Sequence, residues 1–355
     1  MHDVAIAGGG PAGLAAAIRS ARRGFRTVLF ERGGDAPDKA CGEGLMPSGA
    51  RELAQLGVEV AADDRAPFRG IRYLQEDGTT LEARFEGATG MGIRRTALAR
   101  ALRDRARACG AELLQGSVIQ VRALADCAEL RTTDRTLEAR LVIAADGLHS
   151  PLRKAAGLDA AAAGPLRYGI RRHFALSPWT DFVEVYWAPD AEAYVTPVGP
   201  RTVNVAFLRR RETAAGFDGL LEHFPALQRK LSGAPAASEE RGAGPLLQRT
   251  RARCGPRLAL VGDAAGYVDA ITGQGLSLAF AASAILMQAL PDDLSADLAP
   301  ALRRYDRGLQ SRWIRYALPA HGLLALSRRP PLRRAALRAL AKIPPVFAIL
   351  VRALE

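Results

Sequence analysis

Three glycines near the start of the chain have the spacing that lets a backbone turn hold a pyrophosphate. Gly8, Gly10 and Gly13 follow the pattern G-x-G-x-x-G, with Pro11 and Ala12 inside it. Glycine allows the tight turn and the close approach of backbone to phosphate, and the free amides at the start of a following helix attract an anion. The pattern predicts a dinucleotide-binding turn, provided that a strand precedes it and a helix follows.

A carboxylate follows this turn at a distance suited to a ribose. Glu31 lies 18 residues after Gly13, at the end of an apolar run, and Arg32 comes next. A carboxylate there can accept both ribose hydroxyls of an AMP moiety, and it repels a 2′-phosphate. Glu31 therefore favours FAD or NAD over NADP, and a solvated glutamate after a strand is the alternative interpretation.

Two later apolar runs end in an aspartate beside a glycine. Residues 141–145 lead into Asp146-Gly147, and residues 258–261 lead into Gly262-Asp263. Either pair alone could be an ordinary turn, because Asp and Gly are common at strand ends. An aspartate in the position of Asp263 can also bind a ribityl hydroxyl, so both pairs are candidate cofactor contacts.

The segments around these residues predict a sheet-and-helix protein with a β-rich middle. Residues 3–31 have the pattern strand, turn, helix and strand, which is the unit of a dinucleotide-binding sheet. Residues 68–86 alternate like a hairpin that turns at Asp77-Gly78. Helices are expected over 95–109, 217–231 and 276–290, and further strands over 168–176, 183–187, 194–197 and 203–208.

Together and in this order, the three motifs resemble those of the FAD-dependent oxidoreductases that include para-hydroxybenzoate hydroxylase and the geranylgeranyl reductases. The resemblance covers most of residues 1–300. It implies an α/β fold of the para-hydroxybenzoate hydroxylase type, a Rossmann-type FAD-binding domain with an inserted β-rich substrate domain. The expected FAD-binding domain comprises 1–70, 90–165 and 252–300, the substrate domain comprises 71–89 and 166–251, and 301–355 form a basic helical C-terminal segment.

The resemblance also assigns cofactor contacts. Arg95 would open a helix beside FAD, with Arg94 as the rival for that role, and Val118 would lie on the strand that passes the adenine. The expected FAD contacts are Gly8, Gly10, Pro11, Ala12, Gly13, Glu31, Arg32, Cys41, Gly42, Arg95, Val118, Asp146, Gly147, Gly262, Asp263, Gly273, Gly275 and Leu276. Because the chain has one nucleotide fingerprint, NAD(P)H is the implied reductant and would dock transiently, without a domain of its own.

Two reactions remain open at this point. The loop 39–45, with Cys41 and Gly42, and the segment 262–275 resemble the geranylgeranyl reductases. Their Tyr-x-Trp-x-Phe-Pro signature is changed here, since Val195 and Thr196 replace the tryptophan and phenylalanine. Hydroxylases of lipid-like phenols are also similar. The resemblance favours monooxygenation of a hydrophobic phenolic or polyketide-derived substrate with NAD(P)H and O2, with isoprenoid double-bond reduction as the alternative.

Candidate catalytic side chains are expected on strands of the substrate domain. Arg171, His173, Tyr186 and Tyr194 could stabilise an ionised phenol, whereas Cys41 would border the alkene in a reductase. Each has an ordinary alternative: a satisfied strand histidine, a tyrosine that only lines a pocket, or a cysteine near the flavin without a reactive thiolate.

Composition sets the outer limits. The 355 residues are 48% hydrophobic and 24% charged, which excludes a mostly disordered chain. The four cysteines lack disulfide or metal spacing, so we expect no metal site and a cytoplasmic location. We expect neither a signal peptide nor a membrane-spanning helix, because the first strand begins at once and no run of 18 apolar residues occurs.

Most of the net positive charge comes from the C-terminal end. The net charge is +12, and the last 53 residues carry twelve basic and two acidic residues. Arg334, Arg338 and Lys342 recur on one face of an expected helix, and the apolar stretch 343–351 follows. This pattern suits an anionic membrane surface, and a helix packed on the FAD-binding domain is the alternative. Nucleic-acid motifs are absent from the sequence, so we expect no nucleic-acid partner.

Overall fold

A largely parallel sheet collects strands from the start, middle and later parts of the chain. The computed structural model describes residues 1–34, 36–161, 164, 166–213 and 215–352. The sheet has the order β19-β20-β11-β1-β2-β8, with the antiparallel β10 and β9 added beside β11. Its strands are β1 (His2–Ala7), β2 (Thr27–Glu31), β8 (Glu112–Gln115), β9 (Val118–Ala123), β10 (Ala128–Thr132), β11 (Thr136–Ala144), β19 (Cys254–Gly255) and β20 (Leu258–Leu260).

The pairing of these strands determines where the polar motifs meet. β1 pairs in parallel with both β2 and β11, and β11 pairs in parallel with β20. The carboxyl ends of parallel strands lie at one edge of a sheet. Glu31, Asp146 and Asp263, which come at or after the ends of β2, β11 and β20, are therefore brought to the edge where the glycine turn leaves β1.

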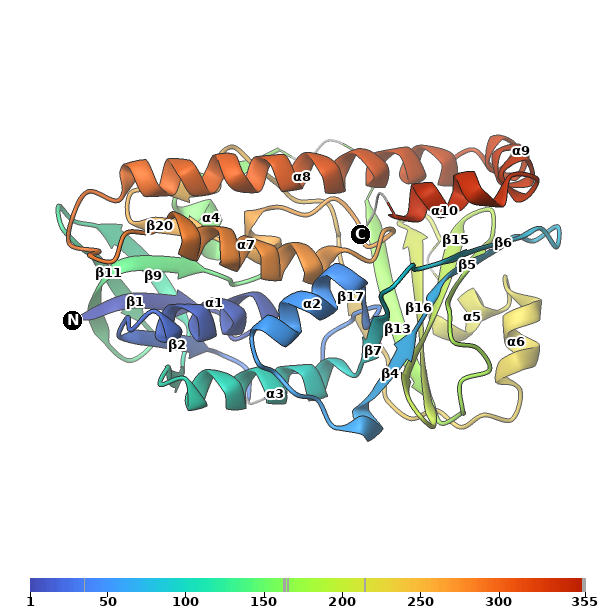
Figure 1. The fold of residues 1–355 in the computed structure, drawn as a ribbon, viewed down its shortest axis with the longest axis horizontal. Helices are drawn as coiled ribbons and strands as arrows, with labels where there is room; N and C mark the ends of the chain where they lie inside the picture. Colours follow the sequence, from blue (N-terminus) through green and yellow to red (C-terminus); the bar gives the residue numbers. More distant parts are fainter. Residues whose placement is uncertain (35, 162–163, 165, 214, 353–355) are drawn as a thin grey trace.

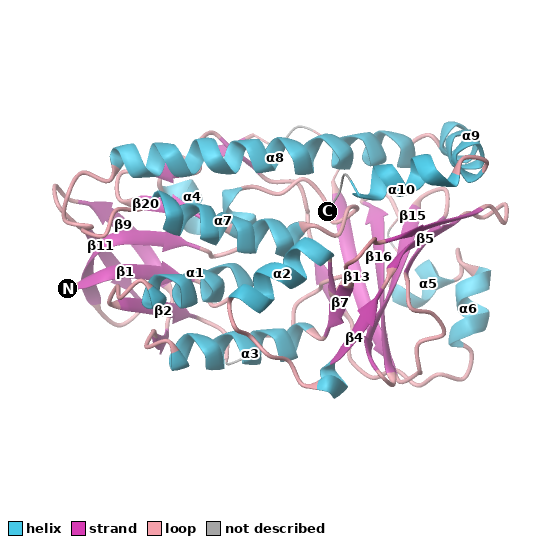
Figure 2. Cartoon of the chain, in the orientation of Figure 1, coloured by secondary structure: helices cyan, strands magenta, loops and turns pink. Residues whose placement is uncertain are grey.

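Helices cover this sheet (Figures 1 and 2). α1 (Pro11–Arg22) packs against α7 (Gly275–Ala289) and α3 (Arg95–Ala108), while α2 (Pro47–Gln55) lies against α7. The close approach of α1 relies on its small residues, since Ala15, Ala16 and Ala17 are fully buried. The helices expected over 95–109 and 276–290 correspond to α3 and α7. A short helix, α4 (Pro151–Ala155), follows β11.

A second, mostly antiparallel sheet has the order β17-β13-β16-β15-β14-β5-β6. Its strands are β5 (Gly70–Leu74), β6 (Thr80–Arg84), β13 (Arg167–Phe174), β14 (Val183–Trp187), β15 (Ala191–Gly199), β16 (Thr202–Arg210) and β17 (Arg241–Ala243). The hairpin expected over 68–86 is β5 paired with β6. Smaller elements are β3 (Gly44–Leu45), β4 (Arg65–Phe68), β7 (Gly90–Ile93), β12 (Asp159–Ala160), β18 (Arg249–Thr250), η1 (Ala62–Asp64) and η2 (Gly262–Ala265).

The single helix expected over 217–231 is wrong. The chain forms α5 (Phe217–Leu221) and α6 (Pro225–Leu231) instead. Pro225 cannot donate a backbone hydrogen bond, and it disfavours helical geometry in Phe224, whose φ and ψ are −127° and 67°. Proline is well tolerated in the first turn of a helix, so Pro225 begins a new helix rather than continuing the old one.

Three C-terminal helices complete the fold: α8 (Ala299–Ser327), α9 (Pro330–Ala341) and α10 (Pro344–Arg352). α8 runs alongside both sheets (Figure 1). Its first half packs into the core of the parallel sheet through Tyr305 and Leu309, and its second half contributes Tyr316 and Leu324 to the apolar cluster at the second sheet. No helix in the described ranges is both long and apolar enough to cross a bilayer. Residues 353–355 of the basic segment lie outside the described residues.

Candidate active site

The glycine turn between β1 and α1 has no room for side chains. A Cβ on Gly13 would lie 1.9 Å from the carbonyl oxygen of Gly8, and a Cβ on Gly8 would lie 2.4 Å from that of Ala145. Gly8 also has a φ of 108°, which favours glycine. Gly10 is the N-cap of α1 and has no side chain to cap the first amides. These amides remain available to a phosphate, as the sequence motif predicts.

Glu31 is fastened to this turn. Its side chain is buried, and its two carboxylate oxygens accept hydrogen bonds from the amides of Gly9 (2.6 Å) and Gly33 (2.8 Å). Each oxygen has a second lone pair that a ribose hydroxyl could use. The alternative of a solvated glutamate does not describe this residue. The neighbouring Arg32 is exposed.

Arg95 places a buried guanidinium beside the turn. It is the first residue of α3, and its Nη2 lies 3.9 Å from where a Cβ on Gly10 would be. Its Nη1 is buried without a hydrogen-bond partner among the described residues. A buried, unpaired donor needs an acceptor, and a pyrophosphate oxygen suits it. Arg94 immediately precedes α3, so the residue that the structure places beside Gly10 is Arg95.

The two aspartates at the sheet edge also fit a polar ligand. Oδ2 of Asp146 accepts a hydrogen bond from the amide of Leu152 (3.1 Å), while its Oδ1 is buried without a partner in the described part of the chain. Burial raises the pKa of Asp146, and it raises the pKa of Asp263 to about 6 against the opposing charges of Arg95 and Lys39. Both carboxylates would gain from accepting hydroxyl hydrogen bonds of a cofactor.

The remaining predicted cofactor residues lie in three places: beside the glycine turn, at the start of α7 and on β9. A Cβ on Gly262 would lie 2.6 Å from the Cβ of Ala12, so the segment with Asp263 packs directly on the glycine turn. Gly273, Gly275 and Leu276 lie at the start of α7, where free amides can stabilise negative charge. Val118 begins β9 and is buried in the core of the sheet, and two residues before it the Gly116 amide donates to the Glu31 carbonyl oxygen (3.0 Å).

The loop with Cys41 lies near the charges of Arg95 and Asp263. The Cys41 Sγ accepts a hydrogen bond from the amide of Glu43 (3.3 Å). Burial, followed by the charge of Glu43, raises the pKa of the Cys41 thiol, although the nearby Arg95 opposes this. The residue is therefore a protonated thiol and not a thiolate. The neighbouring Gly42 is exposed.

A buried polar network ties this loop to the second sheet. Glu43 is buried and adopts a φ of 58°, which is unusual for a side-chain-bearing residue. Its Oε1 accepts the Arg95 amide (2.7 Å), and its Oε2 lies 2.6 Å from Nε2 of His173 on β13. Nδ1 of His173 lies 2.9 Å from the hydroxyl of Ser238. The carboxylate thus connects the loop, α3 and β13.

Arg171 belongs to the same network. Its buried guanidinium forms an ion pair with Asp38 and donates hydrogen bonds to the Ser238 hydroxyl (3.0 Å) and toward Nδ1 of His173 (3.2 Å). Since an arginine only donates, the tautomer with hydrogen on Nε2 of His173 satisfies both of its neighbours. Arg171 and His173, the candidates for contact with a phenol, are therefore hydrogen-bonded to other side chains of this network beside the Cys41 loop.

The two candidate tyrosines face different surroundings. The Tyr194 hydroxyl on β15 donates toward the carbonyl oxygen of Ile271 (3.4 Å), which places it beside the segment 262–275. Burial raises the pKa of Tyr194 well above its ordinary value. The Tyr186 hydroxyl donates to Glu184 (2.6 Å) and its ring packs in the apolar cluster that includes α5 and α6. By the family resemblance, Gly273, Gly275 and Leu276 would lie at the pyrimidine edge of the flavin, so Tyr194 is the candidate of the two that adjoins the expected flavin region.

An apolar cluster borders the segment 262–275. It joins Val268 and Ile271 of that segment to Met46 after the Cys41 loop. Most of its other members come from the second sheet and from α8, α9 and α10, including Tyr73, Trp187, Leu324, Leu337 and Phe347. The region next to the expected flavin ring is therefore hydrophobic.

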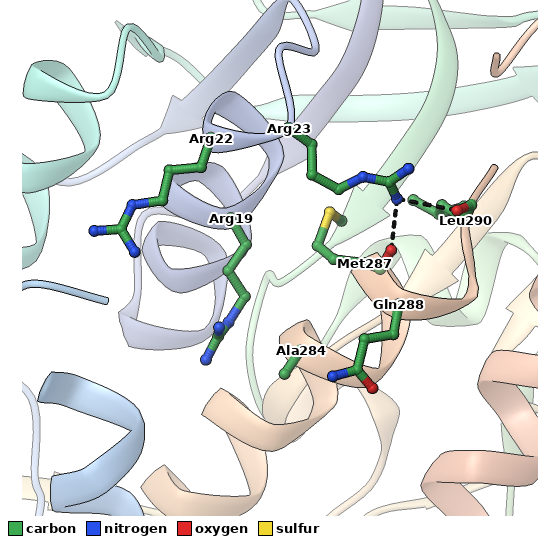
Figure 3. Close-up of a pocket in the computed structure, with 7 residues that line it drawn as sticks. All are labelled: Arg19, Arg22, Arg23, Ala284, Met287, Gln288 and Leu290. Atoms are coloured by element: carbon green, nitrogen blue, oxygen red, sulfur yellow. Dashed lines mark hydrogen bonds between the residues drawn. The ribbon is translucent and has the colours of Figure 1, made fainter. Parts of the chain in front are cut away.

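A surface hollow of about 450 Å³ lies elsewhere, between α1 and α7 (Figure 3). It is lined by Arg19, Arg22, Arg23, Ala284, Met287, Gln288 and Leu290. Arg23 donates to the carbonyl oxygens of Met287 (2.6 Å) and Leu290 (3.0 Å), and Arg19 pairs with Glu52. The hollow lies at the C-terminal end of α1, opposite the glycine turn, and is not part of the candidate site.

Two residues without a predicted role prove important to the site. Glu43 organises the network described above. Arg153 is buried and donates to Gln248 (2.8 Å) and to the Ala264 carbonyl oxygen (3.2 Å), which joins the segment after Asp146 to the segment after Asp263. Arg153 follows Asp146 by seven residues in the same stretch of sequence, so it lies close to a residue that the sequence does single out. The sequence holds no comparable signal for the contact between Glu43 and His173.

Comparisons with known proteins agree with this geometry. Menaquinone reductase of Mycolicibacterium smegmatis is 29% identical over 303 residues, covering 77% of this chain and 72% of that protein. Digeranylgeranylglycerophospholipid reductase 1 of Methanopyrus kandleri is 29% identical over 346 residues, covering 88% and 85%. The flavin-dependent brominase Bmp2 shares the fold, with a TM-score of 0.84 at 17% identity, covering 99% of this chain and 93% of that one.

The family called FAD binding domain matches residues 1–221, which is more than half of the chain. The motifs, the Rossmann-type α/β fold with its second sheet, and the buried unpaired groups at the glycine turn agree with that match. The chain therefore belongs to the FAD binding domain family and is an FAD-dependent oxidoreductase of the group that includes para-hydroxybenzoate hydroxylase and the geranylgeranyl reductases.

Proposed function

We propose that this oxidoreductase reduces a carbon–carbon double bond in a lipophilic, isoprenoid-type substrate. The main support is the apolar cluster that borders the segment 262–275, where Val268 and Ile271 pack with side chains of the second sheet. An isoprenoid chain needs such surroundings and offers no charge to be balanced. The names of the two relatives, a menaquinone reductase and a digeranylgeranylglycerophospholipid reductase, support the same substrate class.

The polar side chains near the site support this reaction over phenol hydroxylation. Arg171 and His173 are held by Asp38, Ser238 and Glu43, so they are not free to stabilise a phenolate. Bound FAD, once reduced, would supply a hydride to one alkene carbon. The second carbon needs a proton, and the Cys41 thiol can hold one beside the cofactor loop because its pKa is raised.

The electrons would come from NAD(P)H. This part of the proposal rests on the single glycine fingerprint at Gly8–Gly13, which leaves a nicotinamide to dock transiently. Anaerobic mixing of the holoenzyme with NADH or NADPH should bleach the flavin absorbance. If dithionite bleaches the flavin and neither nicotinamide does, the physiological reductant belongs to another class.

Monooxygenation of a lipophilic phenol is the second candidate. The observation in its favour is the neutral Tyr194 hydroxyl, whose long hydrogen bond to the Ile271 carbonyl oxygen (3.4 Å) could be exchanged for one to a phenolic oxygen near the flavin region. O2 would then be a second substrate.

Product mass separates the two reactions. The holoenzyme is incubated with menaquinone-type and polyprenyl substrates, and separately with alkylphenols. Each substrate is tested under two conditions: with chemically reduced FAD in the absence of air, and with NADPH in air. The proposal expects a gain of two hydrogen atoms by an isoprenoid substrate without air. A gain of one oxygen by an alkylphenol, seen only in air, would replace the proposal with the second candidate, and a Glu31→Ala variant should be less active in both assays when FAD is limiting.

A further inference from the structure

The last helix of the described chain exposes apolar side chains to solvent. In and just before α10, Ile343 is 54% exposed, Val346 40%, Ile349 60% and Leu350 50%. Monomeric soluble proteins seldom leave such side chains grouped at their surface without a use for them. We call these four residues the α10 face.

α10 is apolar on both of its sides. Phe347 and Val351, four residues apart, are buried, and the ring of Phe347 packs against Tyr73 with a centroid separation of 5.4 Å. Ile343, Val346 and Leu350 are spaced three and four residues apart and share the outer side. One side of α10 therefore anchors the helix on the β5–β6 hairpin, and the other side has the character of a surface that contacts something apolar.

The surroundings of the α10 face are positively charged. From Arg328 to Arg352 the sequence contains seven cations and no carboxylate. Lys342, directly before the α10 face, is exposed, and so is Arg329 at the start of α9. An apolar helix face next to uncompensated cations complements an anionic lipid surface, which offers acyl chains below a layer of negative headgroups.

This arrangement changes the expectation that the arginine face of α9 meets the membrane. Arg334 pairs with Glu76 (2.8 Å) and Arg338 pairs with Asp77 (2.7 Å), while the buried Arg333 also holds Glu76 (2.8 Å). These ion pairs fix α9 on the turn between β5 and β6. α9 thus supports α10, and the exposed side chains next to it include those of the α10 face and Lys342.

We propose that the α10 face docks this protein on an anionic phospholipid bilayer, with α10 lying in the plane of the interface and Lys342 among the headgroups. The proposal goes beyond the reaction proposed above and does not depend on it, because the docking surface is separate from the glycine turn and the Cys41 loop. The other possible occupants, a second copy of this chain or another protein, are tested as alternatives.

The first test is co-sedimentation of the holoenzyme with vesicles of phosphatidylcholine alone or mixed with phosphatidylglycerol. We expect binding to the mixed vesicles, and a loss of roughly tenfold or more in partition coefficient for the double variant Ile349→Asp/Leu350→Asp. Ile119→Asp is the matched control, since Ile119 is 48% exposed on β9 of the other sheet. Lys342→Glu should weaken binding about fivefold or more, and Arg131→Glu, exposed on β10, should not.

A second measurement reports the depth of the helix. A tryptophan placed by Val346→Trp should shift its emission to the blue on anionic vesicles and be quenched by brominated lipid, whereas Ile119→Trp should not respond. Three results would overturn the proposal: equal binding by the wild type and the Ile349→Asp/Leu350→Asp variant, binding that ignores lipid charge, or a wild-type dimer that this variant dissociates without any change in vesicle binding.

Discussion

Single side chains at this site have two tasks, holding the protein backbone and facing the cofactor. Glu31 accepts the amides of Gly9 and Gly33, so it shapes the turn before any ribose binds. Arg95 and Asp146 keep buried polar atoms without a partner in the described chain, which makes them dependent on a ligand. A substitution at these positions should therefore affect cofactor affinity more than it affects folding.

The Glu31→Ala variant removes a side chain that performs both tasks. Charge-assisted hydrogen bonds contribute about 1.5–3 kcal/mol each, so losing those to the turn and the ribose should weaken FAD binding at least ~10-fold. Flavin fluorescence titration of the apoprotein measures this. Glu59→Ala, at an exposed position, is the control, and an unchanged FAD affinity in Glu31→Ala would show that this carboxylate does not hold the cofactor.

Asp263 should make the stability of the apoprotein depend on pH. Its pKa is raised to about 6 by burial, so the folded state binds the proton more tightly than the unfolded state does. The resulting stabilisation is complete below pH 4 and is lost as pH rises through about 6, up to about 3 kcal/mol in total. Asp263→Asn should equal the wild type at pH 4 and exceed it at pH 7.5 in urea unfolding. The exposed Asp104→Asn is the control, and equal stabilities of Asp263→Asn and wild type at pH 7.5 would contradict this assignment.

At the scale of elements, the site depends on strands and loops that meet at one edge of the parallel sheet. The glycine turn and the acids after β2, β11 and β20 can be predicted from sequence, because each is a local pattern at the end of a strand and parallel pairing brings those ends together. The contact of Glu43 with His173 spans 130 residues. The two residues meet because β13 lies against the Cys41 loop, and no local sequence pattern encodes that packing.

The glycine turn itself tolerates no added atom. Gly13→Ala would place a methyl group 1.9 Å from the Gly8 carbonyl oxygen, so the turn must open and FAD binding should be lost. Gly322→Ala is a sharp control, because a Cβ there meets nothing within 4 Å and lies inside α8. That change should raise stability by up to about 1 kcal/mol in thermal unfolding. Normal flavin content in purified Gly13→Ala would refute the steric argument.

The Glu43–His173 pair should hold the Cys41 loop closed. Removing either side chain leaves the facing atom of its partner, Oε2 of Glu43 or Nε2 of His173, buried without this hydrogen bond, and the loop, already in a left-handed conformation at Glu43, should open more often. Glu43→Ala and His173→Ala should each speed alkylation of Cys41 about tenfold or more, and the double variant should add little. Peptide mass spectrometry follows the labelling, with the buried Cys127 as the internal reference. Equal labelling rates at Cys41 in the wild type and all variants would show that the Glu43–His173 contact does not control the opening of the loop.

At the scale of the whole molecule, α8 and the ion pairs of α9 join parts that are distant in sequence. Tyr305 packs in the core of the parallel sheet, and Tyr316 packs in the cluster at the second sheet. The basic composition of the C-terminal segment can be read from the sequence, but the carboxylates with which its arginines pair cannot. Arg333, Arg334 and Arg338 meet Glu76 and Asp77 more than 250 residues earlier in the chain.

Arg333 should therefore be the residue that keeps α9 and α10 on the second sheet. Its guanidinium is buried, pairs with Glu76, donates to the Ala188 carbonyl oxygen (3.1 Å) and lies over the Trp187 ring. Arg333→Met leaves the Ala188 carbonyl oxygen without its donor and removes one ion pair of Glu76, a cost of about 1–3 kcal/mol, so it should release the two helices before the core unfolds. Hydrogen exchange should quicken in peptides from 330–352 and stay slow in β1 and β11. Arg329→Met, at an exposed position, is the control and should leave exchange unchanged. Slow exchange of α9 in Arg333→Met would contradict the prediction, because it would mean that apolar contacts such as that of Leu337 hold the helix without the ion pair.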